Sequence, residues 1–133
     1  MKIVIDTNVI VSALFFGGKP RALLELVTTG HLDIFVSQEI LAEYKATIDY
    51  LLEKYHGHQL SPFLPEFTKV ASVIEPSSRV RVCRDPDDNK FIECALDGQC
   101  NYIVSGDKDL LDIKRFKNIR IISVSEFLGL YGS

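Results

Sequence analysis

The chain has 133 residues, of which 47% are hydrophobic, and a formal net charge of −3 at pH 7. This length and apolar content suit one hydrophobic core, so we expect a single domain over residues 1–133. The mildly negative charge gives no general attraction for nucleic acid, and any polyanionic partner must be held locally. No apolar run approaches the roughly 20 residues that cross a bilayer, and no secretory leader is apparent. We therefore expect a cytoplasmic protein without membrane contact.

Cysteine and histidine positions do not predict a structural metal site. Cys83, Cys94 and Cys100 are odd in number and lack CxxC spacing, so we expect reduced thiols in or near the core. His56 and His58 form an HxH pair in a probable loop, without a third ligand nearby in the sequence. A hydrated turn is the simpler interpretation of that pair.

Strand and helix patterns alternate along the chain. Short β-branched and apolar runs predict strands at 2–5, 31–36, 102–105 and 120–123. Apolar residues at helical spacing predict helices at 8–16, 20–28, 37–55, 61–74 and 89–96, with a last helix from about 125. Ser37 and Ser61 suit helix N-caps, and the DKDLLDI sequence is expected to form a turn.

This alternation predicts a three-layer α/β/α sandwich with a central, mostly parallel sheet of about four or five strands. In such sheets, functional groups gather beyond the carboxyl ends of the strands, near the point where the strand order reverses. Side chains that directly follow a predicted strand are therefore the first candidates for a functional site.

Four acidic residues stand where this architecture would bring them together. Asp6 directly follows the first strand, and Asp107 follows the YIVSG sequence at the end of a later one. Asp88 precedes a helix whose apolar residues fix its orientation. Glu43 lies about 60° from Ile40 around the third helix, at the border of its apolar stripe. All four can reach one edge of the sheet.

Carboxylates that converge in this way need a cation to remain ionised together. Mg²⁺ and Mn²⁺ are hard ions that prefer carboxylate and water oxygens, and both are often bound together with phosphates. Such an ion can activate a water molecule and stabilise the leaving oxygen of a phosphodiester. The acids therefore point to phosphodiester hydrolysis.

Each acid taken alone also has a structural interpretation. Asp6 and Asp88 suit helix N-caps, and Glu43 could be a solvated helix charge. Asp107 and Asp109 could serve turn formation. Only the combination of the four favours a catalytic site.

The order of the motifs resembles the PIN domain family. DTN after the first strand, SQEILAEYK, CRDPDDNKFIECAL and YIVSGDKDLL occur in that order. They are similar to those of the toxin components related to the VapC toxins of toxin–antitoxin pairs. The resemblance extends from Lys2 to Leu130 and implies a PIN-like nuclease domain. It implies a Mg²⁺- or Mn²⁺-dependent endoribonuclease acting on single-stranded or structured RNA.

The resemblance also implies roles for individual residues and partners. By position, the catalytic acids and metal ligands would be Asp6, Glu43, Asp88 and Asp107, with Asp85 or Asp87 as alternatives to Asp88. Supporting roles around the ligands would fall to Thr7, Asn8, Ser105 and Asp109. A homodimer is implied, and so is an antitoxin protein that covers the acid pocket.

Basic residues near the acidic motifs are candidates for contact with RNA phosphates. They are Arg79, Arg81, Arg84 and Lys108. A strand with one charged face explains the three arginines equally well, so the sequence leaves both interpretations open.

Other functions remain possible from the sequence. An aspartyl phosphatase typically needs a second Asp two residues after the first, where this chain has Asn8. A Toprim-like nucleic-acid enzyme would share the paired acids Asp107 and Asp109, but its Glu should follow an early strand. A non-catalytic RNA- or partner-binding module of the same fold is the other alternative.

Overall fold

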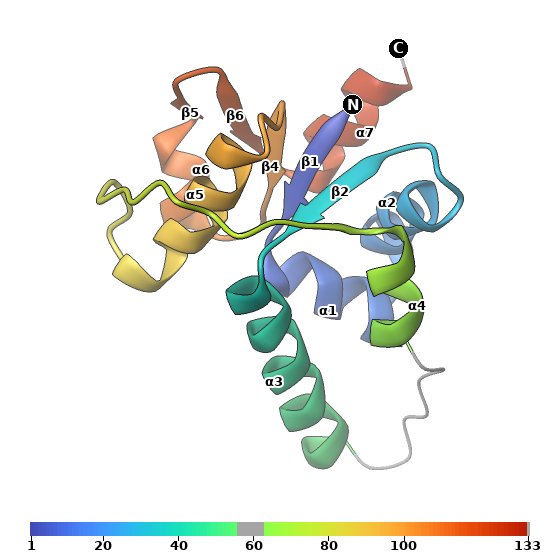
Figure 1. Cartoon of the computed structure of the whole chain (residues 1–133). Helices are drawn as coiled ribbons and strands as arrows, with labels where there is room; N and C mark the ends of the chain where they lie inside the picture. Colours follow the sequence, from blue (N-terminus) through green and yellow to red (C-terminus); the bar gives the residue numbers. More distant parts are fainter. Residues whose placement is uncertain (56–62, 133) are drawn as a thin grey trace.

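Helices and strands alternate along the computed structural model, which describes residues 1–55 and 63–132 (Figure 1). The strands are β1 (Lys2–Ile5), β2 (Asp33–Val36), β3 (Ser72–Val73), β4 (Tyr102–Val104), β5 (Arg115–Phe116) and β6 (Ile119–Ile122). The α-helices are α1 (Thr7–Phe15), α2 (Gly18–Thr28), α3 (Gln38–Lys54), α4 (Phe63–Val70), α5 (Asn89–Asp97), α6 (Lys108–Ile113) and α7 (Val124–Tyr131). A short 3₁₀ turn, η1 (Pro86–Asp88), leads into α5.

The sheet has the strand order β3-β2-β1-β4-β6-β5. All neighbouring strands are parallel except β5 and β6, which form an antiparallel pair. The predicted α/β fold with a mostly parallel sheet is thus confirmed. The sheet has six strands because β3 and β5, each two residues long, extend its edges.

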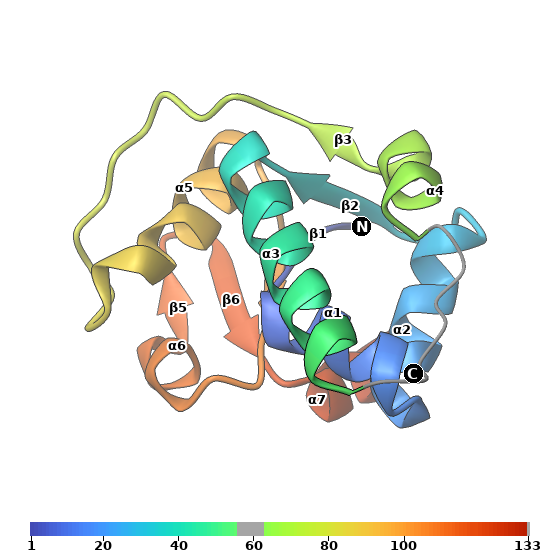
Figure 2. The ribbon, with the colours of Figure 1, turned by 90° about the horizontal axis from the view of Figure 1, so that it is seen from below.

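Helices lie on both faces of this sheet (Figures 1 and 2). On one face, α5 packs against β1, β2 and β4, while α1, α2 and α7 lie on the other side of the sheet. The core between the layers includes Ile3, Ile103, Phe91 and Phe127, all essentially inaccessible to solvent. The long helix α3 projects away from the sheet, starting near the carboxyl ends of the strands (Figure 1).

Local signals explain where several elements begin and end. The Ser37 hydroxyl accepts a hydrogen bond from the Ile40 amide at 3.2 Å, so Ser37 caps α3 as predicted. Gly30 follows α2 with a φ of +82°, a conformation that glycine adopts without strain. The last helix starts at Val124, one residue earlier than predicted, because Ser123 caps it.

Two predicted elements differ from the structure, and the strand suggested for the three arginines does not form. The DKDLLDI sequence forms helix α6 instead of a turn, because Asp107 caps it and Leu110 is buried. The helix predicted over 61–74 ends at Val70, since the chain then pairs with β2 as strand β3. The segment 74–84 carries three of the candidate arginines and is extended but joins no strand pair. The Ser61 cap and the His56 and His58 pair lie outside the described residues.

The cysteine prediction is confirmed. Cys94 and Cys100 are buried, Cys83 is half-buried, and all three are free thiols. Burial raises the pKa of the Cys94 and Cys100 thiols to about 12, so both stay protonated at neutral pH. Among the residues that the structure describes, no helix combines the length and apolar character needed to cross a membrane.

Candidate active site

The strand order reverses between β1 and β4, because the chain runs from β1 through β2 to β3 on one side and places β4 on the other. Sheets of this kind bind ligands at such a switch point, outside the carboxyl ends of the strands. Ile5 pairs with Val104, so the residues that follow, Asp6 and Ser105, emerge side by side. The Asp6 amide continues the pairing by donating to the Val104 carbonyl at 3.0 Å.

A cavity of about 330 Å³ opens at this point. Eight residues line it: Asp6, Thr7, Asn8, Glu43, Thr47, Asp85, Asp88 and Asp107. The structure thus brings all four predicted acids to one cavity, from β1, α3, the start of α5 and the end of β4. Asp85 joins them, whereas Asp87, the other alternative ligand of the DPDD sequence, does not line the cavity.

Asp6 is held at the base of this site. Its side chain is 5% exposed, and the Ser105 hydroxyl donates to its Oδ2 atom at 2.8 Å. Asp6 occupies the N-cap position of α1 but its carboxylate makes no capping hydrogen bond, so the cap interpretation is wrong. Burial raises the pKa of Asp6, and the charges of Asp107 and Glu43 raise it further, against the hydrogen bond from Ser105.

Ser105 connects two of the acids. While its hydroxyl donates to Asp6, the same oxygen accepts the Asp107 amide at 2.9 Å. The Asp107 carboxylate in turn accepts the Leu110 amide at 3.3 Å and caps α6. Asp107 therefore has a structural role in addition to its place in the cavity.

Asp88 is half-buried and makes no capping hydrogen bond, although it stands at the N-cap position of α5. The capping acid of this turn is Asp85, which accepts the Asp87 amide at 3.0 Å. Burial raises the pKa of Asp88 to about 6, and the charges of Asp107 and Asp6 contribute to this rise. An acid that caps nothing and resists ionisation is typical of a functional site.

Glu43 is not a solvated helix charge. The Thr7 hydroxyl donates to its Oε2 atom, and the Lys90 ammonium pairs with its Oε1 atom at 2.7 Å. Thr7 is buried at the start of α1, directly after Asp6. Thr7 and Ser105 therefore each hold one of the predicted acids in place.

Lys90 is a residue of this site that the sequence interpretation missed. Its side chain is 6% exposed, and its ammonium lies 3.0 Å from an Asp87 carboxylate oxygen. Burial alone would lower the pKa of Lys90, but the hydrogen bonds to Glu43 and Asp87 raise it. The available signal was the i,i+3 spacing of Asp87 and Lys90 at the start of a helix, which places opposite charges side by side.

Two acidic side chains of the same motifs lie outside the cavity lining. Asp87 is 72% exposed and pairs with Lys90. Asp109 forms an ion pair with Arg84 at 3.1 Å. The side chain of Lys108, between Asp107 and Asp109, is exposed to solvent.

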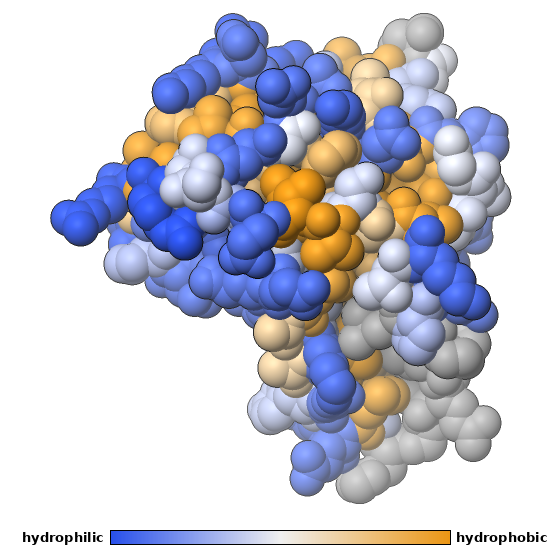
Figure 3. Space-filling view, viewed as in Figure 1, coloured by the Kyte–Doolittle hydropathy of each residue, from blue (hydrophilic) through white to orange (hydrophobic). Residues whose placement is uncertain are grey.

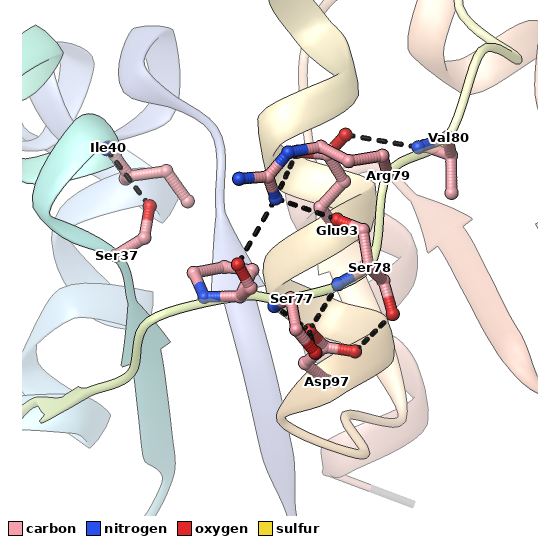
Figure 4. Close-up of polar contacts among 9 residues, drawn as sticks. Ser37, Ile40, Ser77, Ser78, Arg79, Val80, Glu93 and Asp97 are labelled. Carbon is pink, nitrogen blue, oxygen red and sulfur yellow. Dashed lines mark hydrogen bonds and ion pairs between the residues drawn. The ribbon is translucent and has the colours of Figure 1, made fainter.

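A larger cavity of about 680 Å³ is lined by Lys90 and by several residues of the segment 74–84. Arg79 and Arg81 line it together with acids such as Glu93. Arg79 donates to the carbonyl oxygens of Pro76 and Ser78 and lies 3.9 Å from Glu93 (Figure 4). On this side of the molecule, hydrophilic side chains surround a hydrophobic area near the centre of the view (Figure 3).

Side chains of α5 hold the segment 74–84 in place. Glu93 accepts the Val80 amide at 3.0 Å, and Asp97 accepts the amides of Ser77 and Ser78 (Figure 4). Asn89, one helical turn before Glu93, accepts the amides of residues 82 and 83. Backbone amides of this extended segment therefore donate their hydrogen bonds to side chains of α5 and not to a neighbouring strand.

The donor set of the smaller cavity suits a hard divalent cation, because it consists mainly of carboxylate oxygens, with the hydroxyls of Thr7 and Thr47 and the carboxamide of Asn8. Burial is the main cause of the raised pKa values of Asp6 and Asp88, and the charges of neighbouring acids raise both further. Among the described residues, no three acidic, His or Cys side chains are gathered closely enough to hold an ion as they stand.

The pKa values of Asp6 and Asp88 predict that the metal-free protein is more stable in mild acid. Both pKa values are raised above the unfolded value of about 4, so the folded state binds more protons between pH 4 and about 6. The free energy of unfolding should fall as the pH rises through that window. In EDTA, we expect a higher melting temperature at pH 5.5 than at pH 7.5.

Asp88→Asn should flatten this dependence, because it removes one of the two titrating carboxyls. The lowered pKa values of Asp87 and Asp97 act in the opposite direction, but only below about pH 4. Thermal melts of parent and variant across this pH range test the prediction. A parent melting temperature that rises steadily from pH 5 to pH 7.5 would contradict it.

Comparison with known proteins agrees with the resemblance found in the sequence. Residues 2–109 match the PIN domain family. The chain is 38% identical over 119 residues to the uncharacterized protein MJ1680 of Methanocaldococcus jannaschii, covering 86% of this chain and 76% of the relative. The fold is similar to the crystal structure of VapBC2 from Rickettsia felis bound to a DNA fragment from their promoter. That match has a TM-score of 0.55 at 16% identity and covers 92% of this chain and 98% of that chain. The chain therefore belongs to the PIN domain family.

Proposed function

We propose that the protein is a Mg²⁺- or Mn²⁺-dependent endoribonuclease that hydrolyses phosphodiester bonds of RNA. The observation that carries this proposal is the single cavity lined by Asp6, Glu43, Asp88 and Asp107. Membership of the PIN domain family supports a nuclease. In this proposal, residues 1–133 form one PIN-like nuclease domain.

Within this proposal, Asp6 is the central ligand, because burial and the Ser105 hydroxyl fix its carboxylate at the end of β1. Asp88 and Asp107 complete the ligand set from two other segments, and Glu43 contributes from α3. These residues would hold a Mg²⁺ or Mn²⁺ ion, which would supply an activated water and offset the charge that develops on the phosphate.

Contacts with RNA would come from exposed cations beside the cavities. Arg81 lines the larger cavity, and Lys108 is exposed next to Asp107. Arg79 and Arg84 pair with Glu93 and Asp109, so reaching a phosphate would cost them those contacts. Arg81 and Lys108 are therefore the better candidates of the four predicted cations.

We further propose that the protein is the toxin of a toxin–antitoxin pair, acts in the cytoplasm and forms a homodimer. The structural match is to VapBC2, which was crystallised bound to promoter DNA. Phe16, directly after α1, is 79% exposed, and Leu130 on α7 is 46% exposed, so apolar side chains are available for contact with a second copy. Leu23 and Leu24 on α2 are buried in the core and do not contribute to such an interface. A monomer in light scattering at tens of micromolar would count against the homodimer.

The alternatives make different demands on the structure. Glu43 lies on helix α3 and not after an early strand, and the chain matches the PIN domain family, so the Toprim-like alternative is set aside. A non-catalytic PIN module would bind RNA or a protein partner without turnover. The cleavage assay distinguishes it from the enzyme.

The test is cleavage of a labelled single-stranded RNA and a labelled hairpin by the purified protein. We expect internal cleavage in Mn²⁺ or Mg²⁺ that stops on addition of EDTA and resumes when excess metal is restored. Cleavage that persists in EDTA would contradict metal dependence. RNA binding without cleavage under any metal would favour the non-catalytic module.

A further inference from the structure

Lys90 has no surplus hydrogen-bonding capacity. Its ammonium has three donors. They meet three acceptors: Glu43 Oε1 at 2.7 Å, Asp87 Oδ2 at 3.0 Å and the Asp87 carbonyl oxygen at 2.8 Å. A lysine that is 6% exposed and fully paired is not free to bind an RNA phosphate. Any influence of Lys90 on the reaction must therefore pass through the groups that it holds.

The group that matters is Glu43. The Lys90 ammonium pairs with its Oε1 atom and the Thr7 hydroxyl donates a hydrogen bond to its Oε2 atom, so both carboxylate oxygens are held. Glu43 lines the smaller cavity of about 330 Å³, called the acid cavity from here on because five carboxylates line it. Lys90 lines the larger cavity. The ion pair thus forms part of the wall between the two cavities and connects α3 with α5.

Charge gives the contact a second consequence. Of the described residues, five carboxylates line the acid cavity, and neither Lys nor Arg is among those lining it. The Lys90 ammonium lies directly behind one of these carboxylates and offsets part of their repulsion. Without it, Glu43 would lose its orientation and turn away from the other acids, toward solvent.

We propose that Lys90 is a positioning residue, which holds Glu43 toward the acid cavity so that the carboxylate can serve the bound ion. This role rests on the proposed function. It assigns Lys90 neither to the substrate nor to the ion, but to the orientation of one ligand. Removal of such a supporting contact typically weakens metal affinity or activity by roughly 10- to 100-fold.

The test measures Mn²⁺ affinity by calorimetric titration for the parent, Lys90→Met, Glu43→Gln and the double variant. We expect Lys90→Met to weaken Mn²⁺ binding by roughly tenfold or more. The double variant should bind Mn²⁺ no more weakly than Glu43→Gln alone, because Lys90 acts through Glu43. In RNA cleavage, kcat should fall while KM for RNA stays unchanged.

Lys45→Met is the matched control. It removes the same charge from an ion pair with Asp49 on α3, where the Lys45 side chain is 66% exposed, and should leave Mn²⁺ affinity unchanged. If Lys90→Met does not fold, Lys90→Gln replaces it, and we expect its Mn²⁺ affinity to fall by roughly tenfold as well. Circular dichroism and melting establish that each variant is folded.

Two results would overturn the role of Lys90 specifically. One is parent-like or tighter Mn²⁺ binding by the folded Lys90 variant, which would make Lys90 a structural residue or a competitor of the ion. The other is a loss of Mn²⁺ affinity on Lys90→Met that is as large in the Glu43→Gln background as in the parent. A parent that binds no Mn²⁺ and cleaves no RNA would instead overturn the proposed function, and the role of Lys90 with it.

Discussion

Asp6→Asn is expected to reduce Mn²⁺-dependent RNA cleavage by orders of magnitude while leaving the protein folded. The amide keeps the shape of the side chain but removes the charge needed to bind and polarise the ion. Asp6 is buried, and both burial and neighbouring acids raise its pKa, so a neutral side chain should be tolerated well there. Weak RNA binding through exposed Lys and Arg side chains should persist. Cleavage assays in Mn²⁺ and EDTA, with melting curves in parallel, test this expectation.

Asp109→Asn is the matched control for this variant. Asp109 carries the same charge in the adjacent motif, but it pairs with Arg84 outside the acid cavity. Its loss should therefore cost much less activity. If Asp6→Asn cleaves RNA like the parent, or loses activity only because it unfolds, Asp6 is not a ligand.

The strand ends could be predicted from the sequence because their signals are local. A short β-branched run followed directly by an acid marks Asp6 without any knowledge of the fold, and an acid shortly after a second such run marks Asp107. Parallel pairing of β1 with β4 then brings the two segments together. The border position of Glu43 on α3 follows from helical spacing alone.

Lys90 could not be predicted in the same way. A lysine at the start of a helix is ordinarily exposed, and only the packing of α3 against α5 makes it a buried partner of Glu43. The arrangement of segment 74–84 could not be predicted from the sequence for a similar reason. Its amides pair with Asn89, Glu93 and Asp97, and hydrogen bonds between side chains and distant backbone leave no periodic signal.

Edge strands and short helices mark the other limit of sequence prediction. β3 and β5 are two residues long, too short for an alternating pattern to be recognised. The six-residue helix α6 follows an acid and contains two more, a composition equally suited to a turn. What decides in favour of a helix is the burial of Leu110 in the core.

Mn²⁺ should raise the melting temperature of the parent substantially, because a ligand that binds only the folded state stabilises it by linkage. At 100 times the dissociation constant this stabilisation is about 2.7 kcal/mol, which corresponds to roughly 10 °C for a domain of this size. Asp6→Asn should lose most of this shift, whereas Asp109→Asn should retain it. Thermal melts in EDTA and across a Mn²⁺ titration measure the effect directly.

The most informative result of this experiment is which of the two proteins, parent or Asp6→Asn, has the higher melting temperature with and without Mn²⁺. In EDTA, Asp6→Asn should melt at the same temperature as the parent or higher, because it removes a buried charge that other acids repel. In saturating Mn²⁺ the parent should melt higher, because only its full acid set binds the ion tightly. A purely structural Asp6 predicts no such reversal, since metal would then shift both proteins equally. If Mn²⁺ raises the melting temperatures of parent and variant equally, Asp6 is not a metal ligand, even if the variant is inactive.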